Sequence, residues 1–142
     1  MARQEGISKA FTLEVVTPTR VVITEEVEEA IAPGSEGHFG VLGGHLPFIS
    51  TLKTGDLSYR RNGHWRYLAV SWGYAEVRGE RMIVLAETAE RAEEIDVARA
   101  ARARDRALER LARWGDESID ILRAQAALNR ALTRIEVAAK AR

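Results

Sequence analysis

The chain changes character at the segment from Ile95 to Ala100. Before this segment, short alternations of apolar and polar residues are separated by glycine, proline and asparagine, which is typical of β-strands joined by turns. After it, glycine and β-branched residues become scarce and alanine dominates, which favours helices. This change predicts an α+β fold with a β-sandwich domain over residues 1–88 and a two-helix domain over residues 89–142.

Short strands separated by turns are predicted for the beginning of the chain. Residues 11–16 alternate with a period of two, and two further strands are predicted at 21–23 and 27–32. The stretch from 34 to 50 holds five of the eleven glycines and is predicted to be loop and bend. Residues 1–9 are polar and small, and we expect them to be frayed.

Two hairpins are predicted to complete the β-rich part. Asn62-Gly63 joins the strands expected at 57–61 and 65–70, and it is a strong turn signal because both central residues of a type I′ turn need positive φ. Gly79 suits a second tight turn, between strands at 74–77 and 82–85. The pattern predicts roughly eight to ten short strands, enough for two packed sheets, and it favours a sandwich or barrel over a parallel sheet.

Two helices joined by a short turn are predicted for the second part. They run from about Glu93 to Arg113 and from about Glu117 to Ala139, with Gly115 as a C-terminal cap and Asp116 as an N-cap. Helices joined in this way pack antiparallel. The apolar faces are formed by Val97, Ala100, Ala101, Ala107, Leu108 and Leu111 on the first helix and by Ile121, Ala124, Leu128, Leu132 and Ile135 on the second. Alanines and single leucines bury modest area, so we expect the hairpin to be able to detach or open.

Arginines recur along both predicted helices. The chain has 18 arginines and 3 lysines, and the first helix carries arginines at steps of three and four between Arg99 and Arg113. Arg123, Arg130 and Arg134 share one side of the second helix. Antiparallel pairing therefore predicts that these two arginine stripes face each other.

The facing stripes would gather Arg99, Arg130 and Arg134 beside Asp96, with Arg106 about two turns along. Such a cluster is unfavourable unless carboxylates or an anionic ligand compensate the charge. Three interpretations remain open on the pattern alone. The arginines belong to a solvated amphipathic face, bind a polyphosphate, or contact nucleic acid. The nucleic-acid interpretation is disfavoured because acidic residues are interspersed among the arginines and aromatic residues are scarce.

Composition excludes several classes of function. The net charge is zero and cysteine is absent, which argues against bulk nucleic-acid binding, disulfides and thiolate chemistry. His38, His45 and His64 lack metal-ligand spacing, so we predict no metal site, and neither a catalytic triad nor a phosphate-binding loop is recognisable. No apolar run is long enough to span a bilayer and no signal peptide is recognisable, so we expect a soluble intracellular protein without membrane insertion.

Four segments together resemble the epsilon subunits of F-type ATP synthases. They are FTLEVVTPTRVVI at 11–23, GSEGHFGVLGGHLPFIS at 34–50, TGDLSYR at 54–60 and VLAETAERAEEIDVARA at 84–100. One departure lies in the second segment, where the family usually has Leu-Pro-Gly-His and this chain has Leu42-Gly43-Gly44-His45. The resemblance implies a flattened sandwich of about ten strands followed by a helical hairpin.

The resemblance also implies a function and partners. Members of this family are non-catalytic rotor subunits that bind the gamma subunit and the ring of c subunits, and they lie peripherally on the cytoplasmic face of the bacterial membrane. By analogy, the partner contacts fall on Ser35, Glu36, His38, Leu42 and His45. The hairpin either folds against the sandwich or extends into the catalytic alpha/beta hexamer, where it obstructs ATP hydrolysis.

Some bacterial members bind ATP in the folded hairpin through the motif Ile/Leu-Asp-x-x-Arg-Ala. Ile95, Asp96, Arg99 and Ala100 match every specified position. The family's other ATP contacts fall on Glu90, Arg106, Arg130 and Arg134. ATP is thus expected as a regulatory ligand, and no cofactor is required. The alternative is a stand-alone nucleotide-sensing or nucleic-acid-binding module that uses the same arginine-rich hairpin.

Overall fold

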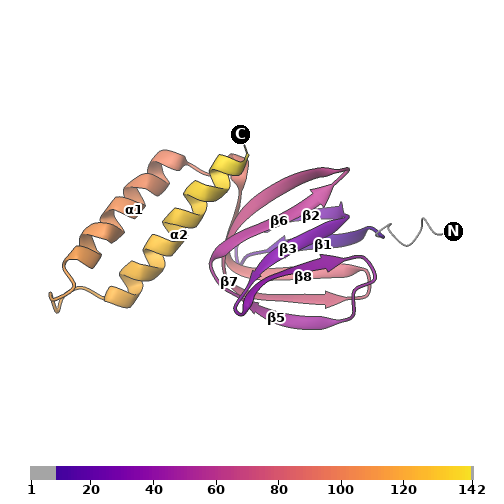
Figure 1. Ribbon diagram of the computed structural model, residues 1–142, viewed down its shortest axis with the longest axis horizontal. Helices are drawn as coiled ribbons and strands as arrows, with labels where there is room; N and C mark the ends of the chain where they lie inside the picture. Colours follow the sequence, from indigo (N-terminus) through magenta and orange to yellow (C-terminus); the bar gives the residue numbers. More distant parts are fainter. Residues whose placement is uncertain (1–8, 142) are drawn as a thin grey trace.

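A sandwich of eight strands is followed by a helical hairpin in the computed structural model, which describes residues 9–141 (Figure 1). The expectation for residues 1–8 lies outside this range. The elements are β1 (Phe11–Val16), β2 (Val21–Val27), β3 (Glu29–Gly34), β4 (Gly37–Leu42), β5 (Phe48–Leu52), β6 (Gly55–Arg61), β7 (His64–Arg78), β8 (Arg81–Arg91), the short 3-10 helix η2 (Ala92–Glu94), α1 (Val97–Ala112) and α2 (Ile121–Lys140). The predicted fold class is confirmed.

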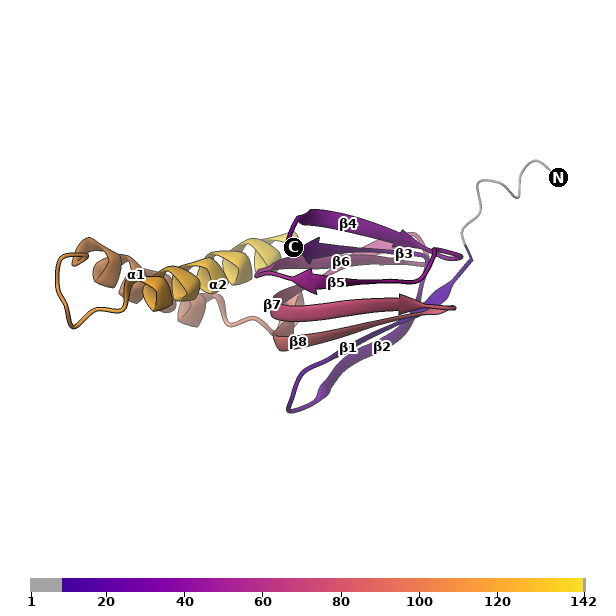
Figure 2. The same cartoon turned by 90° about the horizontal axis from the view of Figure 1, so that it is seen from below.

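The strands form two layers that share β7 (Figure 2). One layer has the order β2-β1-β8-β7-β5 and the other the order β4-β3-β6-β7. The first half of β7 pairs with β6 and its second half with β5. The chain bends between these halves at Trp72 and Gly73, whose φ angles are 51° and 130°. Apolar side chains from both layers, including Leu13, Val15, Leu57, Leu68 and Val84, are buried between them.

Both predicted hairpins are confirmed. Arg61 pairs with His64 across Asn62-Gly63, and both turn residues have positive φ, as a type I′ turn requires. Arg78 pairs with Arg81 across a turn that begins with Gly79.

Three details of the sandwich differ from the prediction. β7 is one strand of 15 residues where two were expected, and the eight strands of the described residues lie within the expected eight to ten. β8 continues to Arg91, past the boundary at residue 88. β1 pairs with β8 in parallel, although an antiparallel sandwich was expected; these two strands are far apart in sequence, so no hairpin turn dictates their direction.

The glycine-rich stretch from 34 to 50 was predicted to be loop and bend, but it contains β4 and the start of β5. Two of these glycines, Gly34 and Gly43, make room for neighbouring atoms. A Cβ at Gly34 would lie 2.9 Å from the ring of Phe39, and one at Gly43 would overlap the backbone of Lys9. The proline of the family motif would meet the same obstacle at position 43.

Both helices begin later than predicted, each at an aspartate cap. The Asp96 carboxylate accepts a hydrogen bond from the backbone N–H of Arg99, and Asp120 does the same for Arg123, each at 3.0 Å. Asp116, predicted as the second cap, instead accepts bonds from the side chain and backbone of Ser118 within the turn. These bonds, with Arg113, lower the pKa of Asp116 to about 2.

Alanines form the contact between the two helices. Ala100 and Ala107 of α1 and Ala124 and Ala131 of α2 are buried, and each pair is spaced by seven residues. Small side chains at this spacing let two helices approach closely. Leu108 and Leu132, predicted for the contact face, are 47% and 42% exposed, because the closer alanine seam excludes larger side chains.

The hairpin joins the sandwich through α2, which is the nearer of the two helices (Figure 1). Val137 and Ala138 near the end of α2 pack with Ala69, Ala92 and Ile95 in a small apolar cluster. At the same end, Lys140 Nζ lies 3.0 Å from the Asp56 carboxylate and 5.3 Å from the centre of the Tyr67 ring. Contact is concentrated at this end of α2.

Candidate functional site

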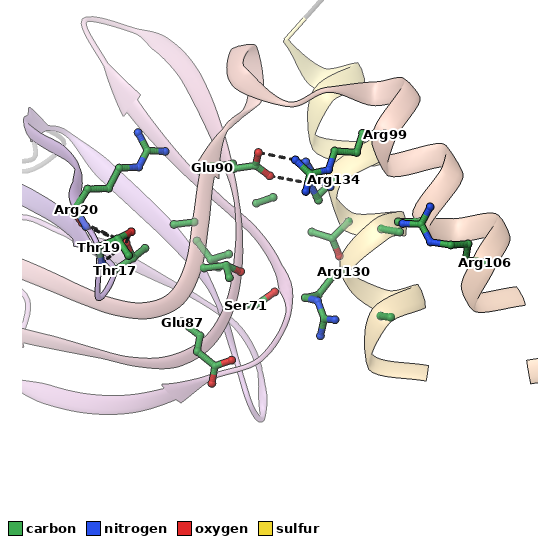
Figure 3. A pocket seen from close by; sticks show the side chains of 18 of the residues that line it. Thr17, Thr19, Arg20, Ser71, Glu87, Glu90, Arg99, Arg106, Arg130 and Arg134 are labelled. Carbon is green, nitrogen blue, oxygen red and sulfur yellow. Dashed lines mark hydrogen bonds and ion pairs between the residues drawn. The ribbon is translucent and has the colours of Figure 1, made fainter. Parts of the chain in front are cut away.

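A pocket of about 530 Å³ lies between the hairpin and the sandwich (Figure 3). Arginines from both helices line one side of it: Arg99, Arg106, Arg110, Arg130 and Arg134. Arg99 and Arg106 extend from α1 toward α2. Five arginines of the two predicted stripes therefore line this pocket together. Its volume lies in the range typical of small-molecule sites.

One ion pair links the two sides of this pocket. Arg134 of α2 donates to both carboxylate oxygens of Glu90 on β8, at 2.7 and 3.2 Å. The side chains are 21% and 33% exposed, so the pair is partly shielded from water. Its geometry is that of a bidentate guanidinium–carboxylate contact, which fixes direction as well as distance.

The other pocket arginines of the hairpin have no acidic partner. Among residues 9–141, no ion pair is formed by the guanidinium groups of Arg99, Arg106, Arg110 or Arg130. Glu87 is the second carboxylate of the lining. The pocket therefore carries an excess of positive charge that an anionic ligand would compensate.

Five of the eight residues predicted for ATP binding line the pocket: Glu90, Arg99, Arg106, Arg130 and Arg134. The other three have structural roles outside its lining. Ile95 belongs to the apolar cluster under α2, Asp96 caps α1 through its carboxylate, and Ala100 is fully buried in the helix contact. The spacing of Asp96 and Arg99 thus produces a cap on the backbone N–H of Arg99, not a contact with its guanidinium group.

Residues of the sandwich complete the pocket and were not identified from the sequence. They are Thr17, Thr19 and Arg20 from the turn between β1 and β2, Ser71 from β7, and Glu87 and Thr88 from β8. Arg20 is bound to Glu94 at 3.2 Å, and this bond lowers the pKa of Glu94. No local motif marks these positions. The order of the strands in the sheet, and not the sequence around each residue, brings them close to the hairpin.

The predicted partner-contact residues lie along strand β4 and its two ends. Ser35 and Glu36 form the turn before β4, and Leu42 and His45 lie at its other end. A strand of six residues separates these ends by about 18 Å. His38 lies between them, and its Nε2 is 3.2 Å from Asp56 Oδ1. The five residues thus follow one edge strand and do not form a compact patch.

A second exposed surface lies on the outer face of the layer β5-β7-β8-β1-β2. Tyr74, Leu85, Val16 and Val21 are paired in one row across four strands. Tyr74, Leu85 and Val21 are 45%, 37% and 56% exposed. A row of exposed apolar side chains is typical of a protein contact surface. No pattern within a single strand marks this row, because the row depends on how neighbouring strands are paired.

The described residues contain neither a metal-binding cluster nor a helix that could span a membrane. Between residues 9 and 141, no group of three or more histidines and acidic residues is arranged to hold a metal ion. Neither helix in that range is long and apolar enough to cross a membrane.

Comparison with known proteins assigns both parts of the chain. The family described as the ATP synthase delta/epsilon chain, beta-sandwich domain, matches residues 10–92, and the corresponding long alpha-helix domain matches residues 93–139. The ATP synthase epsilon chain of Geotalea uraniireducens is 47% identical over 135 residues, covering 95% of this chain and 98% of the relative. The chain belongs to the ATP synthase epsilon chain family.

Other epsilon chains and two solved ATP synthases are similar as well. The epsilon chain of Nitratidesulfovibrio vulgaris is 51% identical over 106 residues, covering 75% of this chain and 79% of its own length. A chain of the Euglena gracilis mitochondrial ATP synthase has a TM-score of 0.76 at 24% identity, covering 96% of this chain and 83% of that chain. A chain of the Tetrahymena thermophila mitochondrial central stalk and c-ring has a TM-score of 0.54 at 12% identity, covering 95% and 98%. These two likenesses show the fold.

Membership in the epsilon family makes the chain a subunit of an ATP synthase, the complex that couples ion transport to ATP synthesis. The resemblance found in the sequence is therefore confirmed. The arginine-lined pocket lies where the two domains of the epsilon chain meet, since its lining comes from both of the matched regions.

Proposed function

We propose that the chain is a non-catalytic subunit of the central stalk whose hairpin senses ATP and restrains ATP hydrolysis. The observation that carries the sensing role is the pocket in which arginines of both helices face the sandwich. Four of these arginines have no acidic partner among residues 9–141. Their mutual repulsion is relieved when a polyanion binds.

The lining of the pocket suits a nucleoside triphosphate. Guanidinium groups form charge-assisted hydrogen bonds with phosphate, each worth about 1.5–3 kcal/mol. Ala69, Ala89, Ala127 and Ala131 offer small apolar surfaces to a base, and Ser71 and Thr88 offer hydroxyl groups. Arginines that converge on one pocket favour a compact polyanion over an extended nucleic acid, which needs an open basic surface.

Binding of ATP would stabilise the folded hairpin, because the ligand touches α1, α2 and the sandwich together. The direct contact between α2 and the sandwich is small: one apolar cluster and the ion pairs of Arg134 and Lys140. A ligand that binds only the folded state shifts the population toward it in proportion to its differential affinity. Loss of ATP would then release the hairpin to extend into the alpha/beta hexamer and inhibit hydrolysis.

The partners of the sandwich are proposed to be the gamma subunit and the c-ring, at the cytoplasmic face of a bacterial membrane. Family membership supports this assignment. The edge strand β4 supports it as well, because exposed residues lie along this strand and at its two ends: Ser35, Glu36, His38, Leu42 and His45. The apolar row through Tyr74 and Leu85 is a second candidate contact for the stalk.

Calorimetric titration of the full chain with ATP tests the sensing role. We expect reversible binding, and replacement of Arg99 and Arg130 together by alanine should weaken it at least about 100-fold, because two guanidinium contacts are lost. Arg102→Ala is the matched control, since Arg102 is exposed on α1 and lines no part of the pocket. Absence of binding by the unmodified chain at cellular ATP concentrations would refute the proposal.

A further inference from the structure

A second cavity lies at the tip of the hairpin, beyond the pocket that faces the sandwich. We call it the tip chamber. Its volume is about 460 Å³. It is lined by Arg110, Ser118, Ile119, Asp120, Arg123, Ala124, Ala127 and Arg130. The ATP assignment does not account for this chamber, and Arg123 lines it without lining the first pocket.

The tip chamber carries an excess of positive charge. Arg110, Arg123 and Arg130 contribute three guanidinium groups, and none of them forms an ion pair among the residues described. Asp120 is the one carboxylate in the lining, and its Oδ1 accepts the backbone N–H of Arg123. Charge compensation by Asp120 leaves a net of two positive charges in the lining, which favours an anionic ligand.

The chemistry of the chamber suits a phosphate group. Guanidinium groups recognise phosphate oxygens through planar, paired hydrogen bonds. The polar lining lacks the large apolar surface that a base would need, since only Ile119 and two alanines are apolar. A small, multiply charged tetrahedral anion meets these conditions.

We propose that the tip chamber is a second anion site, which binds a phosphate group between Arg110, Arg123 and Arg130. The site goes beyond the ATP-sensing role and does not require it. The phosphate comes either from free inorganic phosphate or from the distal part of a polyphosphate chain longer than that of ATP. Both sources present the same chemistry to the three arginines.

The second source is supported by the position of the two cavities, which are neighbours along the hairpin. They share Arg110, Ala127 and Arg130 in their linings. Arg123, Arg130 and Arg134 lie on one face of α2, and Arg123 and Arg134 are about 16 Å apart along the helix axis. A phosphate chain could follow this arginine row from one cavity into the other.

Sharing of Arg110 and Arg130 also couples the two sites. A phosphate held by Arg130 in the tip chamber competes for the guanidinium group that the first pocket would use for ATP. By thermodynamic linkage, each ligand then weakens the other by the same factor. A rise in phosphate would thus reduce the apparent affinity for ATP.

Titration of the full chain with inorganic phosphate tests the site, with the arginine Nε–H resonances observed by NMR. We expect saturable shifts for Arg110, Arg123 and Arg130, and at least about 10-fold weaker binding for Arg123→Gln. The Arg123→Gln variant should fold, because its backbone N–H still donates to Asp120. It should also bind ATP as tightly as the unmodified chain, within about twofold.

Two controls separate this proposal from the ATP assignment. Arg99→Gln should weaken ATP without affecting phosphate, because Arg99 lines only the first pocket. Arg102→Gln should change neither. Unchanged phosphate affinity in Arg123→Gln, or shifts confined to Arg99 and Arg134, would overturn the tip site and leave ATP sensing intact.

A polyphosphate titration identifies the source. If the longer chain is the ligand, long-chain polyphosphate should bind at least about 10-fold more tightly than inorganic phosphate, and it should shift Arg123 and Arg134 together. If free phosphate is the ligand, polyphosphate should bind no more tightly than inorganic phosphate, and the Arg134 resonance should not shift. Either result supports the site, whereas absence of an Arg123 response to both probes would overturn it.

Discussion

Gly73 allows strand β7 to serve both layers of the sandwich. Its φ is +130°, and a Cβ at this position would overlap the carbonyl oxygen of Leu85. Gly73→Ala should therefore lower the free energy of unfolding by roughly 3 kcal/mol or more, through backbone strain and the clash with β8. Urea denaturation followed by tryptophan fluorescence measures the loss.

Gly79 provides the matched comparison for that substitution. It also has positive φ, at 60°, but no atom lies within 4 Å of the position its Cβ would take. Gly79→Ala should cost only about 1–2 kcal/mol, which is the penalty for an alanine in the left-handed region. Equal losses in the two variants would show that the contact with Leu85 is unimportant.

Individual residues of the pocket differ in how readily the sequence identifies them. The arginines of α1 and α2 follow from helical periodicity, because residues three and four apart share a face. Thr19, Ser71 and Glu87 have no such signal, since their approach to the hairpin depends on how the sheet is ordered. Ile95 and Ala100 match the family motif, yet they shape the fold around the pocket and do not line it.

At the scale of elements, the end of α2 is held by the Asp56 carboxylate. Burial raises the pKa of Asp56, but hydrogen bonds and positive charge from Lys140 and His38 outweigh this effect, so the pKa lies below its ordinary value of 3.8. A carboxylate with a lowered pKa stabilises the folded state above its unfolded-state pKa, and this contribution is lost as pH falls through the folded-state pKa. Docking of α2 should therefore weaken below about pH 4.

The Tyr67 ring reports on this contact, because Lys140 lies over it. We expect the NMR resonances of Tyr67 to shift toward the undocked position as the pH falls from about 5 to 2. Asp56→Asn should move the Tyr67 resonances toward the undocked position already at neutral pH, and only part of the way, because the apolar cluster and the Arg134–Glu90 pair remain. Asp105→Asn, on the exposed face of α1, should behave like the unmodified chain. If the Tyr67 resonances of Asp56→Asn change with pH in the same way as those of the unmodified chain, Asp56 does not hold the end of α2.

The observed elements agree with the predicted ones where interactions between neighbouring residues determine the structure. They agree less well where segments far apart in the sequence pack together. Turn chemistry at Asn62-Gly63 requires positive φ and was recognisable in advance. The strand β4 was missed because glycine is usually unfavourable in strands, and the room needed by Phe39 beside Gly34 becomes evident only once β3 and β4 are paired. The cap at Asp120 was likewise displaced from the predicted Asp116 by the local bonds of the turn.

At the scale of the whole molecule, the sandwich and the hairpin line one pocket together, but they differ in how much apolar core each contains. The sandwich has a continuous apolar core between its layers, whereas the hairpin relies on an alanine seam and a contact at one end of α2. Segments with few buried apolar contacts open at low free-energy cost. A ligand that spans both domains can therefore control the position of the hairpin without altering the sandwich.

Removal of the hairpin tests its inhibitory role in the assembled enzyme. The cut belongs after Glu94, because Ala89, Glu90 and Arg91 of β8 still pair with β7 and an earlier cut would damage the sandwich. The shortened chain should assemble normally and raise ATP hydrolysis, most strongly at low ATP, where the full-length hairpin is released from the folded state. Hydrolysis is measured per assembled complex after purification, with the full-length chain as the reference. Equal hydrolysis by the two complexes at every ATP concentration would mean that the hairpin does not restrain the catalytic head, whatever it binds.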